Sequence, residues 1–256
     1  VGDISTKNFQ IANTGATGPA LRGAIQTSGN GANISDARLS GSGVTAADFG
    51  PLAAGASSGN FAVTFTATSA GVIAPQSIRV ANNFDNVADT TLDIVSSAAY
   101  RLAAPGAHTP EPVNFGNRHV GDVVSQTLTL ANNAVADGFS EALNASIGGA
   151  TGAATSNGGS FSLLAAGASN NSALAVGLNT ATAGAKSGTA SITLVSDGAG
   201  TSGLGQTALA GQTVNVSGNV FRYADAGTVT PVPVNFGNHH VGDVVEQALT
   251  VSNVAV

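Results

Sequence analysis

A stretch of 24 residues occurs twice in this chain and limits what the chain can fold into. Residues 109–132 read TPEPVNFGNRHVGDVVSQTLTLAN, and residues 230–253 read TPVPVNFGNHHVGDVVEQALTVSN. The copies are identical at 18 of 24 positions and lie 121 residues apart, as Phe236 lies from Phe115. The first three residues, VGD, match residues 120–122 inside the same stretch. A period of about 120 residues indicates a tandem array of folded units.

Composition excludes several classes of protein. Hydrophobic residues make up 43% of the chain and charged residues only 9%, a balance typical of secreted β-rich repeats rather than of cytosolic enzymes. Eight basic residues stand against 14 acidic ones, so no basic patch exists for a phosphate backbone, and we expect no nucleic-acid partner. Cysteine is absent, which removes disulfides, thiolate metal sites and a Cys nucleophile. No apolar run has membrane-spanning length, so we expect no membrane insertion in this segment.

Apolar residues alternate with polar ones along short stretches, which predicts β-strands. Equivalent apolar positions recur in the repeat, as in Phe9, Leu128 and Leu249. The Gly-rich residues 14–48 and 133–160 differ in length between copies, and we expect loops there that contain one or two strands. No segment combines a 3.6-residue apolar period with helix caps, so helix content should be very low.

The order of motifs resembles a known family. PVNFGN is followed by HVGD, by an alternating strand that ends in Asn, by a Phe just before LAAGAS or its counterpart, and by a further strand of the form I-x-V/L. This order is similar to that of the Hydin-type (ASH) immunoglobulin-like domain and of its bacterial relatives, the choice-of-anchor D repeats of secreted and cell-surface proteins. The resemblance implies a β-sandwich of seven or eight strands with Greek-key connections. The chain departs from the family pattern in residues 146–160 and 197–212, where we expect long loops of Gly, Ala, Ser and Asn.

Together the repeat and the resemblance predict all-β, tandem immunoglobulin-like Greek-key β-sandwiches in a rod-like array. We expect residues 1–104 to form a sandwich that lacks its own first strand, residues 105–226 a complete sandwich, and residues 227–256 the first two strands of a third unit. Because Val1 aligns with the middle of a repeat, we expect the chain to be a segment of a longer protein. Upstream sequence is then the expected source of the missing strand, and strand addition from another chain is the alternative.

The repeated stretch is also the candidate functional site, because it forms the junction between units. Connector prolines lack a backbone donor and fix φ, so the connectors should be short and stiff. The Asp of each VGD should cap a turn, and Tyr100 and Tyr223 should pack at the unit ends. The predicted junction residues are Pro112, Phe115, Gly116, His119, Val120, Gly121 and Asp122, with their counterparts Pro233, Phe236, Gly237, His240, Val241, Gly242 and Asp243.

Catalytic and metal chemistry find little support. His239 and His240 stand near Asp243, but adjacent strand residues point to opposite faces, so we interpret the histidines, His108 included, as solvated or interface turn residues. Residues 85–93 hold three aspartates without the spacing of a calcium loop, which leaves weak calcium binding as an alternative there. No G-x-S-x-G elbow between a strand and a helix is indicated, and neither is a carboxylate pair on a cleft. We expect no enzyme and no cofactor.

The predicted function is structural. We expect a repeat segment of a secreted bacterial surface protein, extracellular or on the cell surface, whose tandem sandwiches form a fibre, stalk or layer by self-association, with strand complementation between subunits as one route. The partner is then another copy or a neighbouring repeat. The alternative is an adhesin stalk or a carbohydrate-binding module that contacts a glycan or surface ligand through variable loops such as residues 197–212.

Overall fold

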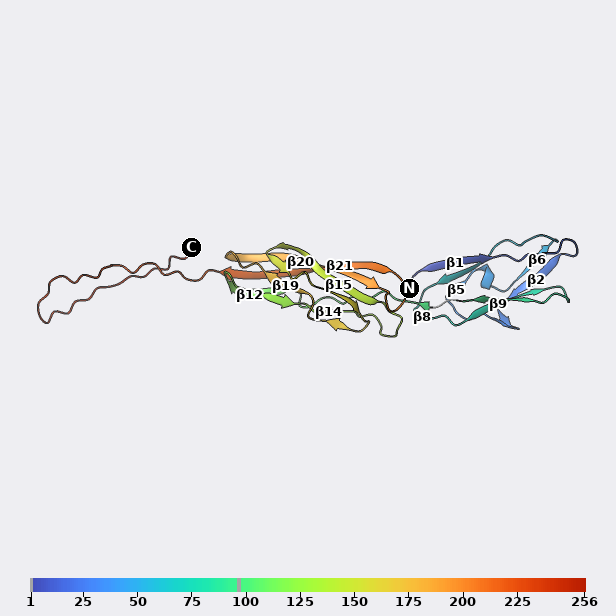
Figure 1. Cartoon of the computed structure of the whole chain (residues 1–256), viewed down its shortest axis with the longest axis horizontal. Helices are drawn as coiled ribbons and strands as arrows, with labels where there is room; N and C mark the ends of the chain where they lie inside the picture. Colours follow the sequence, from blue (N-terminus) through green and yellow to red (C-terminus); the bar gives the residue numbers. More distant parts are fainter. Residues whose placement is uncertain (1, 96–97) are drawn as a thin grey trace.

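The computed structural model describes residues 2–95 and 98–256. Within these residues the only helical element is the short 3₁₀ helix η1 (Ser42–Val44), and strands dominate the rest, which confirms the prediction of an all-β chain. Strands β1 to β11 pair only with one another, and strands β12 to β21 do the same. Figure 1 shows the two resulting bodies end to end, with an extended hairpin leaving the far end of the second. We name residues 1–104 the N-terminal region, 105–226 the central region and 227–256 the C-terminal region.

The central region is a two-sheet β-sandwich. One sheet has the order β12-β21-β20-β15-β17, and the other consists of β13-β19-β16 with the pair β14-β18. Successive strands cross from sheet to sheet, which gives the Greek-key connection of immunoglobulin-like folds. Only β12 runs parallel to its neighbour, β21. The strands are β12 (Val113–His119), β13 (Ser125–Thr127), β14 (Leu130–Ala131), β15 (Ala142–Gly152), β16 (Ala154–Ser156), β17 (Ser160–Leu164), β18 (Ser169–Asn170), β19 (Ala175–Leu178), β20 (Gly184–Asp197) and β21 (Gln206–Phe221).

Alternate residues of the facing strands fill the core of the central region. In β20 the buried apolar residues are Ala190, Ile192 and Leu194, and β21 contributes Val214 and Val216 at the same two-residue spacing. This is the period-two pattern of a sheet with one face turned inward. In the central region the apolar positions predicted from the repeat are therefore buried, as Leu128 is, whereas the counterpart Leu249 in the C-terminal region is exposed.

The N-terminal region has the same kind of strands but a smaller core. Its buried cluster consists of Ile25, Val44 and Ile78, surrounded by half-buried apolar residues. Residues 14–48 hold more regular structure than the one or two strands expected, because β2 to β5 and η1 all lie there. The strands are β1 (Ile4–Phe9), β2 (Leu21–Gln26), β3 (Ser28–Gly29), β4 (Ala32–Asn33), β5 (Leu39–Ser40), β6 (Ala47–Leu52), β7 (Phe61–Thr66), β8 (Gly71–Val72), β9 (Gln76–Asn82), β10 (Thr90–Ile94) and β11 (Ala98–Ala99).

The expectation of long loops at residues 146–160 and 197–212 is wrong. Most of the first stretch belongs to β15 and β16, and the second enters β21 after a turn confined to residues 198–205. The backbone ladder of a strand needs no large side chains, and small ones are required where strands approach closely. A Cβ on Gly188 would overlap the carbonyl oxygen of Thr151, so glycine is the residue that lets β20 and β15 pair there.

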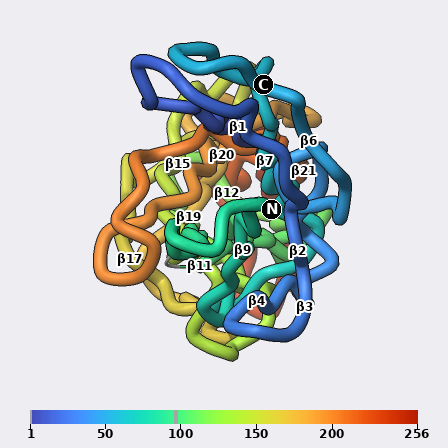
Figure 2. The backbone as a smooth tube through the Cα atoms, turned by 90° about the vertical axis from the view of Figure 1, so that its right-hand side faces the viewer, coloured from blue at the N-terminus to red at the C-terminus, as the bar shows by residue number. Residues whose placement is uncertain are grey.

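A short contact joins the first two regions. The guanidinium of Arg101 donates to Asp137 (2.7 Å), the N–H of Arg101 donates to the carbonyl of Phe139 (2.8 Å), and the ring of Tyr100 lies 5.7 Å from that of Phe139. Figure 2 looks along the long axis and shows the blue strands of the N-terminal region in front of the orange strands of the central region. The two sandwiches thus form a rod-like array.

Candidate strand-addition site

Strand β12 carries the first half of the repeated motif, and it completes the core of the central region. Val113 and Phe115 point inward and are buried, Phe115 to 7% exposure. The left-handed backbone of Gly116 (φ 64°) lies where the register with β21 shifts, and its N–H donates to the side chain of Asn114 (2.8 Å). After this shift Asn117 pairs with Asn219. The strand is therefore held by two inward side chains and a parallel ladder.

A tight turn follows β12. The carboxylate of Asp122 accepts the N–H of His119 (2.8 Å), and the N–H of Asp122 donates back to the His119 carbonyl (3.1 Å), around Gly121 at φ 90°. Thr180 donates its hydroxyl to the Asp122 carbonyl (2.6 Å). The His119 ring stacks on Tyr223, with centroids 4.1 Å apart. This turn therefore lies where the chain leaves the central region.

The C-terminal copy keeps the local geometry of the motif without its burial. Asp243 accepts the N–H of His240 (2.8 Å) and Gly237 donates to Asn235 (2.9 Å), as their counterparts do in the central region. Phe236, however, is 48% exposed, and Val241 is fully exposed. Residues 227–256 form no regular β-strand. Two single β-bridges hold together the hairpin that Figure 1 shows. The second copy of the strand is thus folded locally but unpartnered within the described part of the chain.

The N-terminal region shows the converse situation. None of its described strands occupies the position that β12 has in the central region. The side chains that such a strand would cover are half-buried: Phe9 and Val63 correspond to Leu128 and Val176, which are 0% and 1% exposed. Phe9 and Val63 line a groove of about 460 Å³ between β1, β7 and β10. We name this feature the open groove; its lining residues are Ser5, Lys7, Asn8, Phe9, Leu39, Val63, Phe65, Ile73, Leu92, Asp93, Ile94 and Val95.

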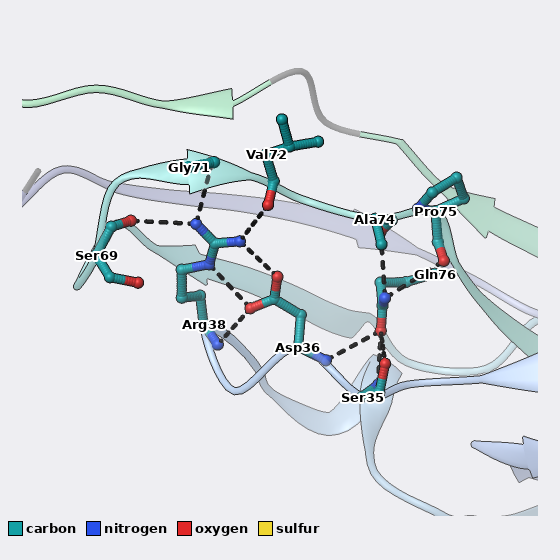
Figure 3. Close-up of polar contacts among 9 residues, drawn as sticks. All are labelled: Ser35, Asp36, Arg38, Ser69, Gly71, Val72, Ala74, Pro75 and Gln76. Carbon is teal, nitrogen blue, oxygen red and sulfur yellow. Dashed lines mark hydrogen bonds and ion pairs between the residues drawn. The ribbon is translucent and has the colours of Figure 1, made fainter. Parts of the chain in front are cut away.

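A half-buried ion pair lies beside the open groove. Arg38 and Asp36 contact each other at 2.6 Å, and this pairing lowers the pKa of the Asp36 carboxyl. The guanidinium also donates to the carbonyls of Ser69, Gly71 and Val72, as Figure 3 shows. Because Gly71 and Val72 form β8, the ion pair anchors the strand on which β11 is aligned.

Beside the ion pair, an amide fastens the same corner of the region. The buried Gln76 accepts backbone hydrogen bonds from Ser35 (2.6 Å) and Asp36 (3.1 Å), and it donates to the carbonyl of Ala74 (3.1 Å). Figure 3 shows this amide spanning two segments of the chain. The edge beside the groove is therefore rigidly tied to the rest of its region.

Two buried polar residues of the central region were missed by sequence reasoning. His108 is buried, not solvated: its ring contacts Gln212 through Nδ1 (2.7 Å) and Glu111 through Nε2 (2.8 Å). Glu141 is also buried and accepts hydroxyl hydrogen bonds from Ser196 (2.7 Å) and Ser202 (2.6 Å). His108 has Val229 as its repeat counterpart, so the repeat gave no signal for it. Both residues tie connector or loop backbone to the sandwich.

The acidic stretch considered for calcium is engaged within the protein. Asp89 pairs with Arg79 and accepts the N–H of Asn82 (2.8 Å). Within residues 2–95 and 98–256, no group of three or more His, Asp or Glu side chains lies close enough to hold a metal ion. In the same part of the chain, no helix is both long and apolar enough to cross a bilayer.

Comparison with known proteins gives distant structural likenesses alone. No protein-family model matches the chain, and no curated protein does. The ASH/PapD-like domain 7 of human CEP192 is 8% identical, with 48% of this chain and 88% of that domain covered at a TM-score of 0.35. CfaE, the adhesive subunit of the CFA/I fimbria of enterotoxigenic Escherichia coli, is 9% identical, with 86% and 80% covered at a TM-score of 0.25. The fold assignment therefore rests on the strand pairing of the chain itself.

Proposed function

We propose that the chain is a structural repeat segment of a bacterial surface protein, in which tandem β-sandwiches build a fibre, stalk or layer through contacts between copies. The three regions are then successive units of one array, divided at residues 104 and 226, and the repeated motif is the junction between them. The motif order shared with choice-of-anchor D repeats supports this assignment, as does a composition rich in small polar residues and free of cysteine.

The observation that carries the proposal is the repetition of one junction at two places in the chain. The same turn hydrogen bonds close at Asp122 and at Asp243, 121 residues apart. The first copy of the motif is the first strand and turn of the central sandwich. The second copy lies in the hairpin that projects from the central region along the long axis of the molecule (Figure 1). An array that repeats its junction in this way adds units without new kinds of contact, and repetition multiplies weak lateral contacts.

Electron microscopy of the purified chain, together with antibody labelling of the producing cells, tests this function. We expect rods that lengthen with protein concentration, and label on intact cells. Isolated particles at every concentration, combined with label that appears only after the cells are permeabilised, would overturn the proposal.

A further inference from the structure

We propose that the central region carries tension along the rod, and that its first and last strands form the clamp that resists this tension. The inference rests on the proposed function, because it names the mechanical task of one unit of the array. The N-terminal region adjoins one end of the central region, and the chain leaves from the other end (Figure 1). Tension along the rod therefore enters and leaves the central region at opposite ends.

The pairing of β12 with β21 converts this tension into shear. The two strands are adjacent and parallel, from Val113 opposite Val216 to His119 opposite Phe221. A pull on the connector draws β12 back toward the N-terminal region, and a pull on the chain after β21 draws β21 the opposite way. Because the hydrogen bonds of the ladder run across the direction of sliding, they share the load and must break together. A pull that separates the two strands from one end would instead break the bonds one at a time.

The connector extends the clamp beyond the backbone ladder. Pro110 and Pro112 have no N–H, so they cannot donate hydrogen bonds to β21. Between them, the carboxylate of Glu111 accepts hydrogen bonds from the backbone N–H (3.0 Å) and the side-chain amide (2.6 Å) of Asn215 on β21. Hydrogen bonds to a charged group are stronger than those between neutral groups. Glu111 thus attaches the connector to β21 where the prolines interrupt the ladder.

A second side chain of β21 holds the connector nearer to its start. The amide of Gln212 donates to the carbonyl of Gly106 (2.8 Å), and its Oε1 accepts the N–H of His108 (2.9 Å). The ring of His108 is buried between the same Oε1, which lies 2.7 Å from Nδ1, and Glu111, which lies 2.8 Å from Nε2. Residues 106–112 are therefore fastened to the strand that also pairs with β12.

Buried polar groups fix the entry end of the connector to other strands. The hydroxyl of Ser196 on β20 accepts the N–H of Ala103 (2.8 Å) and donates to the buried Glu141 (2.7 Å). Asn132, which is 0% exposed and follows β14, accepts the N–H of Ala104 (3.0 Å). Burying a polar group costs free energy unless it is hydrogen-bonded, and these groups hold connector backbone directly or through Ser196. The load is therefore shared by both sheets of the sandwich.

Pulling the full chain in two geometries tests the clamp. The chain has no cysteine of its own, so engineered cysteines give unique handles. The Leu102→Cys/Tyr223→Cys variant, the shear pair, has its handles before the clamp and after β21. In the Val123→Cys/Tyr223→Cys control, the end pair, only the first handle moves, to the turn after β12, so the same two strands are loaded from one end. All three side chains are exposed, so both variants should fold.

Single-molecule force spectroscopy measures the rupture force of each variant, which reports the unfolding barrier along the direction of pulling. We expect the central region to rupture at several-fold higher force in the shear pair than in the end pair. Equal rupture forces in the two geometries, or a lower force in the shear pair, would overturn the proposal.

Two glutamines of β21 test the side-chain contacts of the clamp. Gln212 holds the connector, whereas Gln206 donates to Asp197 (2.7 Å). In the shear pair we expect Gln212→Ala to lower the rupture force and Gln206→Ala to leave it unchanged. In the end pair we expect neither substitution to change the force, because the ladder opens from its far end. Equal losses of force in both geometries would mean that Gln212 adds only general stability, and would refute its part in the clamp.

The outcomes distinguish the clamp from the proposed function. Rods and cell-surface label, found together with equal rupture forces, would reject the clamp and leave the structural function standing. Absence of rods and of label would reject the function itself, whatever the rupture forces are.

Discussion

At the scale of single residues, Phe115 and Phe236 form a natural matched pair, because the same residue in the same motif is buried in one copy and exposed in the other. Phe115→Ala should destabilise the central region by about 3–5 kcal/mol, the usual cost of deleting a buried phenyl group. Phe236→Ala should change the unfolding of a dilute, monomeric chain very little. Urea denaturation of both variants measures the difference, and equal losses of stability would refute the assignment of buried and exposed copies.

Glu111 makes the stability of the central region depend on pH. Burial raises the pKa of its carboxyl, but hydrogen bonds from Asn215 and His108 outweigh burial, and the pKa lies below its ordinary value. A lowered carboxyl pKa in the folded state contributes stability above the unfolded-state pKa of about 4.3, and this contribution is lost as the pH falls through the folded value.

The melting temperature of the wild type should therefore exceed that of Glu111→Gln at pH 7, and the gap should close in acid. The exposed Glu246→Gln serves as the control variant and should show no gap. Thermal melts between neutral and acid pH measure both, and a gap that widens in acid would contradict the role of Glu111.

At the scale of elements, the long pair β20–β21 depends on glycine where β15 and β16 approach it. A Cβ at Gly188 would overlap backbone atoms of Thr151 and Ala154, whereas one at Gly205 would meet nothing within 4 Å. Gly188→Ala should therefore cost about 1–3 kcal/mol or more, as overpacking does. Gly205→Ala should be nearly neutral. Chemical denaturation compares them, and a neutral Gly188→Ala would mean that the strands can separate there at little cost.

At the scale of the whole molecule, the two sandwiches should unfold separately. The core of the central region joins 18 buried residues in one cluster, one of which is Ala103 from the preceding connector, and the N-terminal cluster has three. Differential scanning calorimetry of the monomeric chain should show two transitions, the N-terminal region melting first because less apolar surface is removed from water.

Core variants assign these transitions. Ile78→Ala should lower the melting temperature of the first transition only, and Leu194→Ala that of the second only. Each substitution should reduce the free energy of unfolding of its own region by about 2–5 kcal/mol. A single transition, moved by both variants, would indicate one cooperative unit.

Much of the fold was predictable because strand signals are local. Alternation marked the inward residues of β20 and β21, and the repeat aligned Phe9 with Leu128. The continuation of the strands through residues 148–156 and 206–212 was not predictable in this way. Their Gly, Ser, Thr and Ala residues pair through the backbone, which leaves no apolar period to read. Glu141 and His108 escaped for a related reason, because Ser196 and Ser202 are distant from Glu141 in sequence, and Gln212 is distant from His108.

The sequence by itself determined the all-β class, the spacing of 121 residues between the two copies and the identity of the repeated motif, since these depend on neighbouring residues and on likeness between copies. Only the tertiary structure decided which copy of the motif is buried. The two stretches agree at 18 of 24 positions, yet Phe115 lies in a core and Phe236 lies in solvent. The physical reason is that burial requires a facing sheet as well as an apolar side chain, and the described chain supplies that sheet to one copy of the strand alone.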